Sequence, residues 1–114
     1  MDVPLEITFE GVDHSDAAEE FIREQVSKLE KFFDHVIACR VVLDRPHHSH
    51  TKGDQYEVRI FIDLPGKKDV AVTNHPGNDF RHDDPYVTIR DAFKAAEKQL
   101  KKAVDEIRGN VKSH

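Results

Sequence analysis

The sequence predicts a two-layer α+β domain with the order β-α-β-β-β-α, in which two helices cover one face of a four-stranded sheet. Four segments alternate apolar and polar residues with the period of strands, and two longer segments repeat apolar residues with the period of helices. Because two amphipathic helices must both bury an apolar stripe, we expect them on the same sheet face. The length of 114 residues is that of one domain, so we expect residues 1–114 to form a single domain.

The strands are predicted from alternation and from the turns between them. Pro46 is expected to end the second strand, and Pro65-Gly66 predicts a tight turn between the third and the fourth. Phe61 lies on the opposite face of the third strand, where it either packs under the loop at residues 74–84 or forms an interaction patch. The residues expected on the buried face are Leu5, Ile7 and Phe9, then Ile37, Cys39, Val41 and Leu43, then Tyr56, Val58, Ile60, Ile62 and Leu64, then Val70 and Val72.

The first helix is predicted over residues 16–33. Ser15 or Asp16 is suited to cap it, and Asp16 with Glu19 has the spacing of a capping box. Seven residues repeat with helical period and are expected to face the sheet. They are Ala18, Phe21, Ile22, Val26, Leu29, Phe32 and Phe33.

The second helix is predicted to begin after Asp84, with Asp84 as the N-cap and Pro85 at the first helical position. Gly109 is expected to end it, because glycine is the usual residue just past a helix. The residues expected to face the sheet are Ile89, Phe93, Ala96, Leu100, Ala103, Val104 and Ile107.

The charge of the chain is unevenly placed. With 17 basic and 22 acidic residues the net charge is −5, which by itself argues against a nucleic-acid-binding protein. The second helix nevertheless has a basic stripe beside its apolar face, which consists of Arg90, Lys94, Lys98, Lys101, Lys102 and Arg108. Lys28 and Lys31 add to it from the first helix. Such a stripe either binds a phosphate backbone or is a solvated face with pairs to Asp91 or Glu97.

Three stretches resemble one known family. Residues 28–32 (KLEKF) resemble its K-L-E-K/Q-aromatic run, residues 82–89 (HDDPYVTI) resemble H-E-D-M-Y-x-A-I, and residues 98–102 (KQLKK) resemble R-Q-L-x-K. Residues 37–43 also fit its second strand. On these stretches the chain resembles the ribosome hibernation-promoting and ribosome-associated inhibitor proteins, a family once described as sigma-54 modulation proteins.

The resemblance implies a fold similar to double-stranded-RNA-binding domains and a non-enzymatic function in the cytoplasm. It implies binding to the small ribosomal subunit and its ribosomal RNA, in the channel between head and body, which blocks translation and preserves idle ribosomes under stress. The RNA-binding residues that it implies by position are Lys28, Lys31, Lys98 and Lys102. The basic stripe adds Arg90, Lys94 and Lys101, and Tyr86 is either a packing aromatic or an RNA-facing one. Whether the chain self-associates stays open.

Other chemistries find little support in the sequence. The single cysteine, Cys39, excludes an internal disulfide and is expected to be a small buried hydrophobe. There is no glycine-rich phosphate loop and no G-x-S-x-G motif, and Asp84 is better explained as a cap than as an acid or base beside His82 and Asp83. No cofactor and no small-molecule substrate are expected, and neither a signal peptide nor an apolar segment of about 20 residues is present.

Five histidines leave an alternative open. They are His47, His48, His50, His75 and His82. If the two segments that contain them lie at one end of the sheet, their imidazoles can bind a metal, although solvated loop histidines are the simpler interpretation. The chain can also sense pH, because protonation of all eight histidines would move the net charge from −5 to +3 and strengthen RNA binding in acid. The alternative function is therefore a protein-interaction or metal-responsive module on the same fold.

Overall fold

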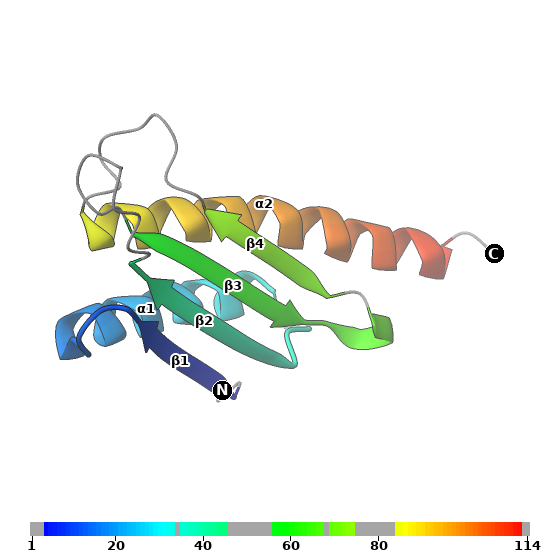
Figure 1. The fold of residues 1–114 in the computed structure, drawn as a ribbon. Coiled ribbons are helices and arrows are strands. Elements are labelled where there is room, and N and C mark those ends of the chain that lie inside the picture. The colour runs from blue at the N-terminus through cyan, green and yellow to red at the C-terminus, as the bar shows by residue number, and fades with distance from the viewer. Residues whose placement is uncertain (1–3, 34, 46–55, 68, 75–83, 113–114) are drawn as a thin grey trace.

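The computed structural model confirms the predicted order of elements. It describes residues 4–33, 35–45, 56–67, 69–74 and 84–112. The elements are β1 (Leu5–Glu10), α1 (Asp16–Phe32), β2 (Ala38–Asp44), β3 (Glu57–Asp63), the short 3₁₀ turn Pro65–Lys67, β4 (Val70–Asn74) and α2 (Pro85–Lys112). The four strands form one layer and the two helices form the other (Figure 1).

The sheet is mixed, with the strand order β1-β2-β3-β4. β1 and β2 are parallel, because α1 returns the chain to the starting end of the sheet before β2 begins. The other two pairs are antiparallel. The predicted tight turn is present between β3 and β4, where Gly66 has a φ of 72° that favours glycine.

One hydrophobic core lies between the two layers, and it contains most of the predicted inward residues. The apolar face of β3 is buried as predicted, while β1, as the edge strand, is only partly covered. On α2, Ile89, Ala96 and Leu100 are fully buried. The sequence pattern missed two further core positions on this helix, Thr88 and Ala92, which are also 0% exposed.

Among the predicted core residues whose side chains the structure describes, two are exposed instead; the side chain of Ile107 lies outside this set. Ile37 is 53% exposed, because β2 begins only at Ala38 and Ile37 extends the sheet through its backbone N–H, which donates to the carbonyl of Asp63 at 2.8 Å. Phe32 is 73% exposed. It lies in the last turn of α1, only about 40° around the helix from Lys28, so it is on the flank of the apolar stripe rather than at its centre.

The start of α1 differs in detail from the prediction. Ser15 is the N-cap, and its side chain accepts a hydrogen bond from the backbone N–H of Ala18 at 3.1 Å. The predicted capping box is wrong, because with Ser15 as the cap Glu19 lies one residue too far along the helix. The Glu19 carboxylate instead contacts His14 at 2.7 Å and Arg23 at 3.0 Å.

α2 begins as predicted and ends later. The Asp84 carboxylate accepts a hydrogen bond from the backbone N–H of Tyr86 at 2.9 Å, with Pro85 at the first helical position. The prediction that Gly109 ends the helix is wrong, because α2 continues to Lys112. A glycine inside a helix costs about 1 kcal/mol relative to alanine, which is not enough to end it.

An ion-pair cluster joins three strands on the sheet face away from the helices. The guanidinium of Arg59 on β3 contacts carboxylates from all three, at 2.9 Å to Glu10, 3.3 Å to Asp44 and 2.7 Å to Glu57. On the same face the guanidinium of Arg40 lies 4.7 Å from the ring centroid of Phe61. The part of the loop predicted to cover Phe61 that spans residues 75–83 lies outside the described residues.

Within the described residues, no helix is long and apolar enough to cross a bilayer.

Candidate nucleic-acid interface

The predicted basic residues are exposed on the helix layer. Lys28 and Lys31 lie on α1, and the others lie on α2. All of those with a described side chain are exposed; they are Lys28, Lys31, Arg90, Lys94, Lys98, Lys101 and Lys102. The side chain of Arg108 lies outside the described part. The cations therefore come from two adjacent helices of one layer, which is an arrangement suited to a phosphate backbone.

A groove of about 390 Å³ separates the two helices, and we call it the inter-helix groove. From α1 it is lined by Phe21, Gln25, Lys28, Leu29 and Phe32. From α2 it is lined by Arg90, Phe93, Lys94 and Glu97. Its walls thus combine aromatic and aliphatic side chains with three cations and one carboxylate.

The structure does not keep the seven cations on one continuous surface. Lys102 lies on the other side of α2, where it lines a hollow of about 350 Å³ next to β4 together with Asp69 and Glu106. Lys31 is about 60° around α1 from Lys28, which lines the groove. Lys28, Arg90 and Lys94 are therefore the cations that the fold brings together at the groove, and Lys31 and Lys102 lie to either side.

Most of these cations have no internal partner. Arg90 has a long contact of 3.9 Å to Asp91. Within the ranges that the structure describes, no ion pair is present at the six lysines Lys28, Lys31, Lys94, Lys98, Lys101 and Lys102. The interpretation of the stripe as a face of paired charges therefore fails for Glu97, which was its second expected partner.

Acidic residues gather elsewhere on the molecule. Glu6, Glu10, Asp44, Glu57 and Asp63 come from the sheet strands β1 to β3. The first half of α1 is also acidic, and there hydrogen bonds from His14 and then Arg23 lower the pKa of Glu19. The net charge of −5 therefore describes the sheet and the start of α1 rather than the groove between the helices.

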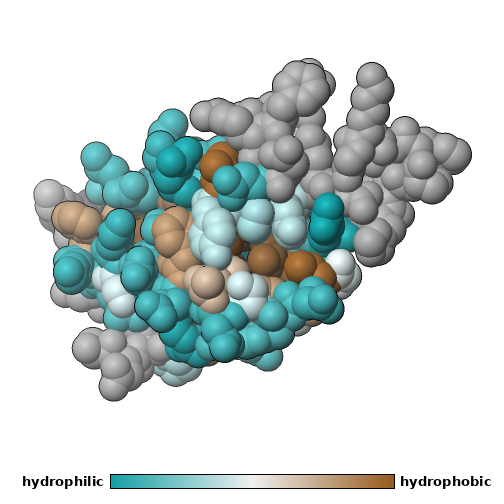
Figure 2. Space-filling model, turned by 90° about the vertical axis from the view of Figure 1, so that its left-hand side faces the viewer, coloured by the Kyte–Doolittle hydropathy of each residue, from teal (hydrophilic) through white to brown (hydrophobic). Residues whose placement is uncertain are grey.

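Tyr86 has a packing role in the structure. Its ring meets that of Phe21 edge to face, with centroids 5.4 Å apart, and this contact joins the first turn of α2 to α1. Tyr86 is still 40% exposed. Figure 2 looks at the end of the molecule where both helices begin and shows a band of hydrophobic residues between hydrophilic ones.

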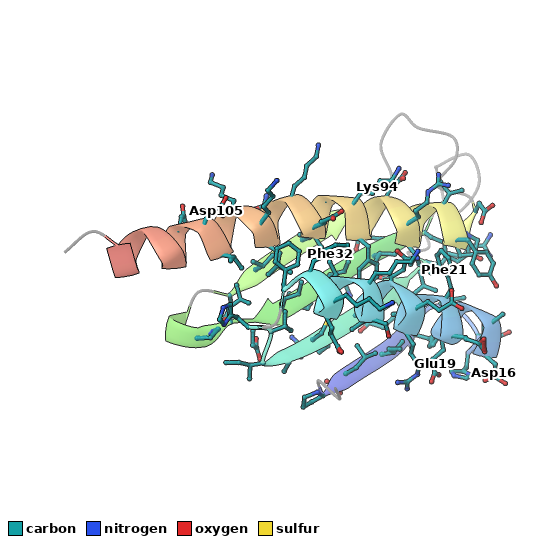
Figure 3. All side chains as sticks on the ribbon, turned by 180° about the vertical axis from the view of Figure 1, so that it is seen from behind. Asp16, Glu19, Phe21, Phe32, Lys94 and Asp105 are labelled. Atoms are coloured by element: carbon teal, nitrogen blue, oxygen red, sulfur yellow. The ribbon has the colours of Figure 1, made fainter. Side chains whose placement is uncertain are left out.

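The sequence pattern missed the aromatic character of the groove. Phe21 and Phe32 were predicted to face the sheet, but both lie on the side of α1 that faces α2 (Figure 3). A signal for this was present, because both residues lie within about 40° of Lys28 on a helical projection. The edge of the apolar stripe therefore faces the neighbouring helix and not the sheet.

The structure gives little ground for catalysis or metal binding among the residues that it describes. Cys39 is buried, and burial raises the pKa of its thiol to about 12, with Glu30 and Asp63 acting in the same direction. No group of three or more metal-ligating side chains is present in this part of the chain. The five histidines of the metal alternative, and the His82-Asp83 pair, lie outside it.

The fold and the groove together define the structural class of this protein. It is a two-layer β-α-β-β-β-α domain with cations along the groove between its two helices. The model of one family, described as "Sigma 54 modulation protein / S30EA ribosomal protein", matches residues 5–108. The chain therefore belongs to this family of ribosome-associated factors, which confirms the resemblance found in the sequence.

Two solved structures are similar to this fold. A ribosomal subunit interface protein from Coxiella burnetii has a TM-score of 0.69 at 20% identity, covering 88% of this chain and 96% of that one. The Thermus thermophilus Protein Y N-terminal domain has a TM-score of 0.65 at 22% identity, covering 90% of this chain and 98% of that one. At these identities the likeness concerns the fold. No curated protein matches the sequence.

Proposed function

We propose that this protein is a non-catalytic translation inhibitor of the hibernation type, which acts in the cytoplasm. In this proposal it binds the RNA channel of the small ribosomal subunit under stress and so keeps messenger and transfer RNAs out. Membership of the S30EA ribosomal protein family supports this assignment, as does a similar fold in a protein described as a ribosomal subunit interface protein.

The observation that carries the proposal is the set of exposed lysines on two adjacent helices, none of which forms an ion pair with a residue that the structure describes. Lys28 of α1 and Lys94 of α2 line the same groove, so one RNA segment can contact both helices. Cations that have no internal partner release bound counterions when they meet phosphates, and this release favours binding. In the proposed complex Arg90, Lys98 and Lys101 add contacts along α2, with Lys31, Lys102 and Tyr86 at the margins.

The acidic sheet face supports a single mode of binding. A phosphate backbone that approached the sheet would meet the carboxylates around Arg59, whose guanidinium is already occupied by three of them. The negative phosphates and the negative carboxylates repel each other, so the RNA is directed to the helix layer. The acidity of the whole chain therefore suppresses non-specific binding while leaving the groove available.

Co-sedimentation with purified small ribosomal subunits tests this function. We expect the chain to sediment with the subunits at low salt, and the double variant Lys28→Gln/Lys94→Gln to remain largely in the supernatant. The matched control is Arg23→Gln/Arg40→Gln, which removes the same charge from α1 and from the sheet face. We expect the control variant to sediment with the subunits and the lysine variant to stay in the supernatant.

Two outcomes would contradict the proposal. If the unmodified chain stays in the supernatant at every salt concentration, it does not bind the small subunit. If both double variants lose binding equally, net charge alone governs the interaction and the groove has no special part in it.

A further inference from the structure

The most exposed large hydrophobic side chain among the described residues is Phe32, with 73% of its surface accessible. It does not complete the core, which is formed on α1 by Ile22, Val26 and Leu29. An aromatic ring that stays exposed to water adds little to the stability of the fold, because little of its apolar surface is buried. Exposed apolar surface of this kind often marks a binding site.

The surroundings of Phe32 leave room on more than one side. It lines the inter-helix groove of about 390 Å³, and it also lines a neighbouring hollow of about 290 Å³ with Phe33, Lys101 and Val104. Since one ring borders both spaces, flat groups can pack against it. Figure 3 shows the ring between the end of α1 and α2.

The charges around Phe32 fit an anionic chain. Lys28 lies one turn before it on α1, and Lys94 lies across the groove on α2. Lys101 lines the neighbouring hollow. Glu97 lines both spaces and Asp105 lines the neighbouring hollow. The inter-helix groove still has three cations, Lys28, Arg90 and Lys94, against the single carboxylate of Glu97.

An aromatic platform flanked by cations is the arrangement that binds single-stranded nucleic acid, because every base has a flat face and every nucleotide has a phosphate. The bases of a duplex are stacked on one another and cannot reach such a ring. A peptide of aspartate and glutamate residues meets the charge requirement, but it has no aromatic ring to stack on Phe32.

We propose that the inter-helix groove binds an unpaired segment of RNA, with one base stacked on the ring of Phe32 and the neighbouring phosphates on Lys28 and Lys94. This inference rests on the proposed RNA-binding function and narrows it from a phosphate backbone of any form to a single strand.

The test compares Phe32→Ala with Phe32→Tyr, which keeps an aromatic ring. The probe is a single-stranded RNA oligonucleotide with one 2-aminopurine, whose fluorescence falls when the base stacks. Stacking on an aromatic residue is worth about 1–3 kcal/mol per base, so we expect Phe32→Ala to weaken binding at least about fivefold and to abolish the quenching. Phe32→Tyr should retain both.

Ile37→Ala is the matched control, because it removes another exposed apolar side chain, 53% accessible, from outside the groove. Its affinity should equal that of the unmodified chain. The salt dependence gives a second readout. We expect Phe32→Ala to leave the slope of log affinity against log salt unchanged and Lys28→Gln to reduce it by about 0.7.

Equal affinity of Phe32→Ala and Ile37→Ala for the oligonucleotide would overturn the inference. So would equally tight binding of the same sequence as a duplex, or binding of a polyglutamate peptide that depends on Phe32 while RNA binding does not. If Phe32→Ala still sediments with small subunits like the unmodified chain, the stacking role fails while the ribosomal function stands. If the unmodified chain binds neither subunits nor oligonucleotide, both proposals fail.

Discussion

At the scale of single residues, similar side chains take different roles because their surroundings differ. Phe32 and Phe93 both belong to apolar stripes, yet Phe93 is 4% exposed and Phe32 is 73% exposed. Arg59 is held by three carboxylates, whereas Lys94 has no ion pair to the described residues. Residue type therefore indicates what a side chain is able to do, and its neighbours decide whether it is available.

Cys39 gives a prediction at this scale. At pH 8 its thiol, with a pKa raised to about 12 by burial, should react with iodoacetamide about a thousandfold more slowly than the same thiol in urea, where an ordinary value near 8.5 applies. The contribution of the buried neutral thiol to stability is complete below pH about 8.5 and is lost as the pH rises towards 12. Mass spectrometry of the alkylated chain measures the rate. Fast labelling of the folded protein would contradict the burial of Cys39.

At the scale of elements, the two helices are fixed by their first turns and by their contact with each other. Ser15 caps α1 and Asp84 caps α2. The edge-to-face pair of Phe21 and Tyr86 then joins the two starting ends. The shape of the inter-helix groove depends on how the two helices are placed against each other. A cap that holds the first turn of a helix therefore contributes to the groove without contacting RNA itself.

The cap of α2 gives a prediction for this scale. Asp84→Ala removes the acceptor for the N–H of Tyr86, so we expect the free energy of unfolding to fall by about 0.5–2 kcal/mol. Asp84→Asn keeps an acceptor oxygen and should lose clearly less. Urea unfolding followed by circular dichroism measures both. An alanine variant as stable as the asparagine variant would show that the cap has no energetic weight.

At the scale of the whole molecule, acidic and basic side chains lie in different regions. Carboxylates gather on the strands β1 to β3 and on the first half of α1, whereas lysines that form no ion pair with a described residue gather on α2 and the second half of α1. The net charge of −5 averages over both and describes neither. A binding partner that meets α2 and the second half of α1 encounters a positive surface on an acidic protein.

This division predicts a steep but limited salt dependence. If Lys28, Arg90, Lys94, Lys98 and Lys101 contact phosphates, the logarithm of the affinity for single-stranded RNA should fall by about 3.5 per decade of salt. Fluorescence anisotropy in a potassium chloride series measures the slope. Lys94→Gln should reduce it more than Lys102→Gln, since Lys102 faces β4. A slope near zero would contradict binding through the backbone.

Much of the fold was predictable, because the spacing of apolar residues along the sequence indicates which segments are strands and which are helices. The alternation of Val58, Ile60 and Ile62 and the helical repeat of Ile89, Phe93 and Leu100 each correspond to one buried face. Element ends were less predictable. Gly109 was expected to end α2, but α2 continues to Lys112, because a glycine inside a helix lowers its stability by only about 1 kcal/mol relative to alanine. Likewise, Asp16 and Glu19 have the spacing of a capping box, but the helix is capped one residue earlier, by Ser15.

The candidate site was predictable in its residue types but not in its geometry. The order of residues along single elements was enough to predict the strand and helix periods, the family motifs and the basic stripe. Three features needed the packed helices to be seen: which cations meet across the groove, the exposure of Phe32 there, and the position of Lys102 on the side of α2 next to β4. Those relations depend on the packing of α1 against α2, and a helical projection of either helix alone does not contain it.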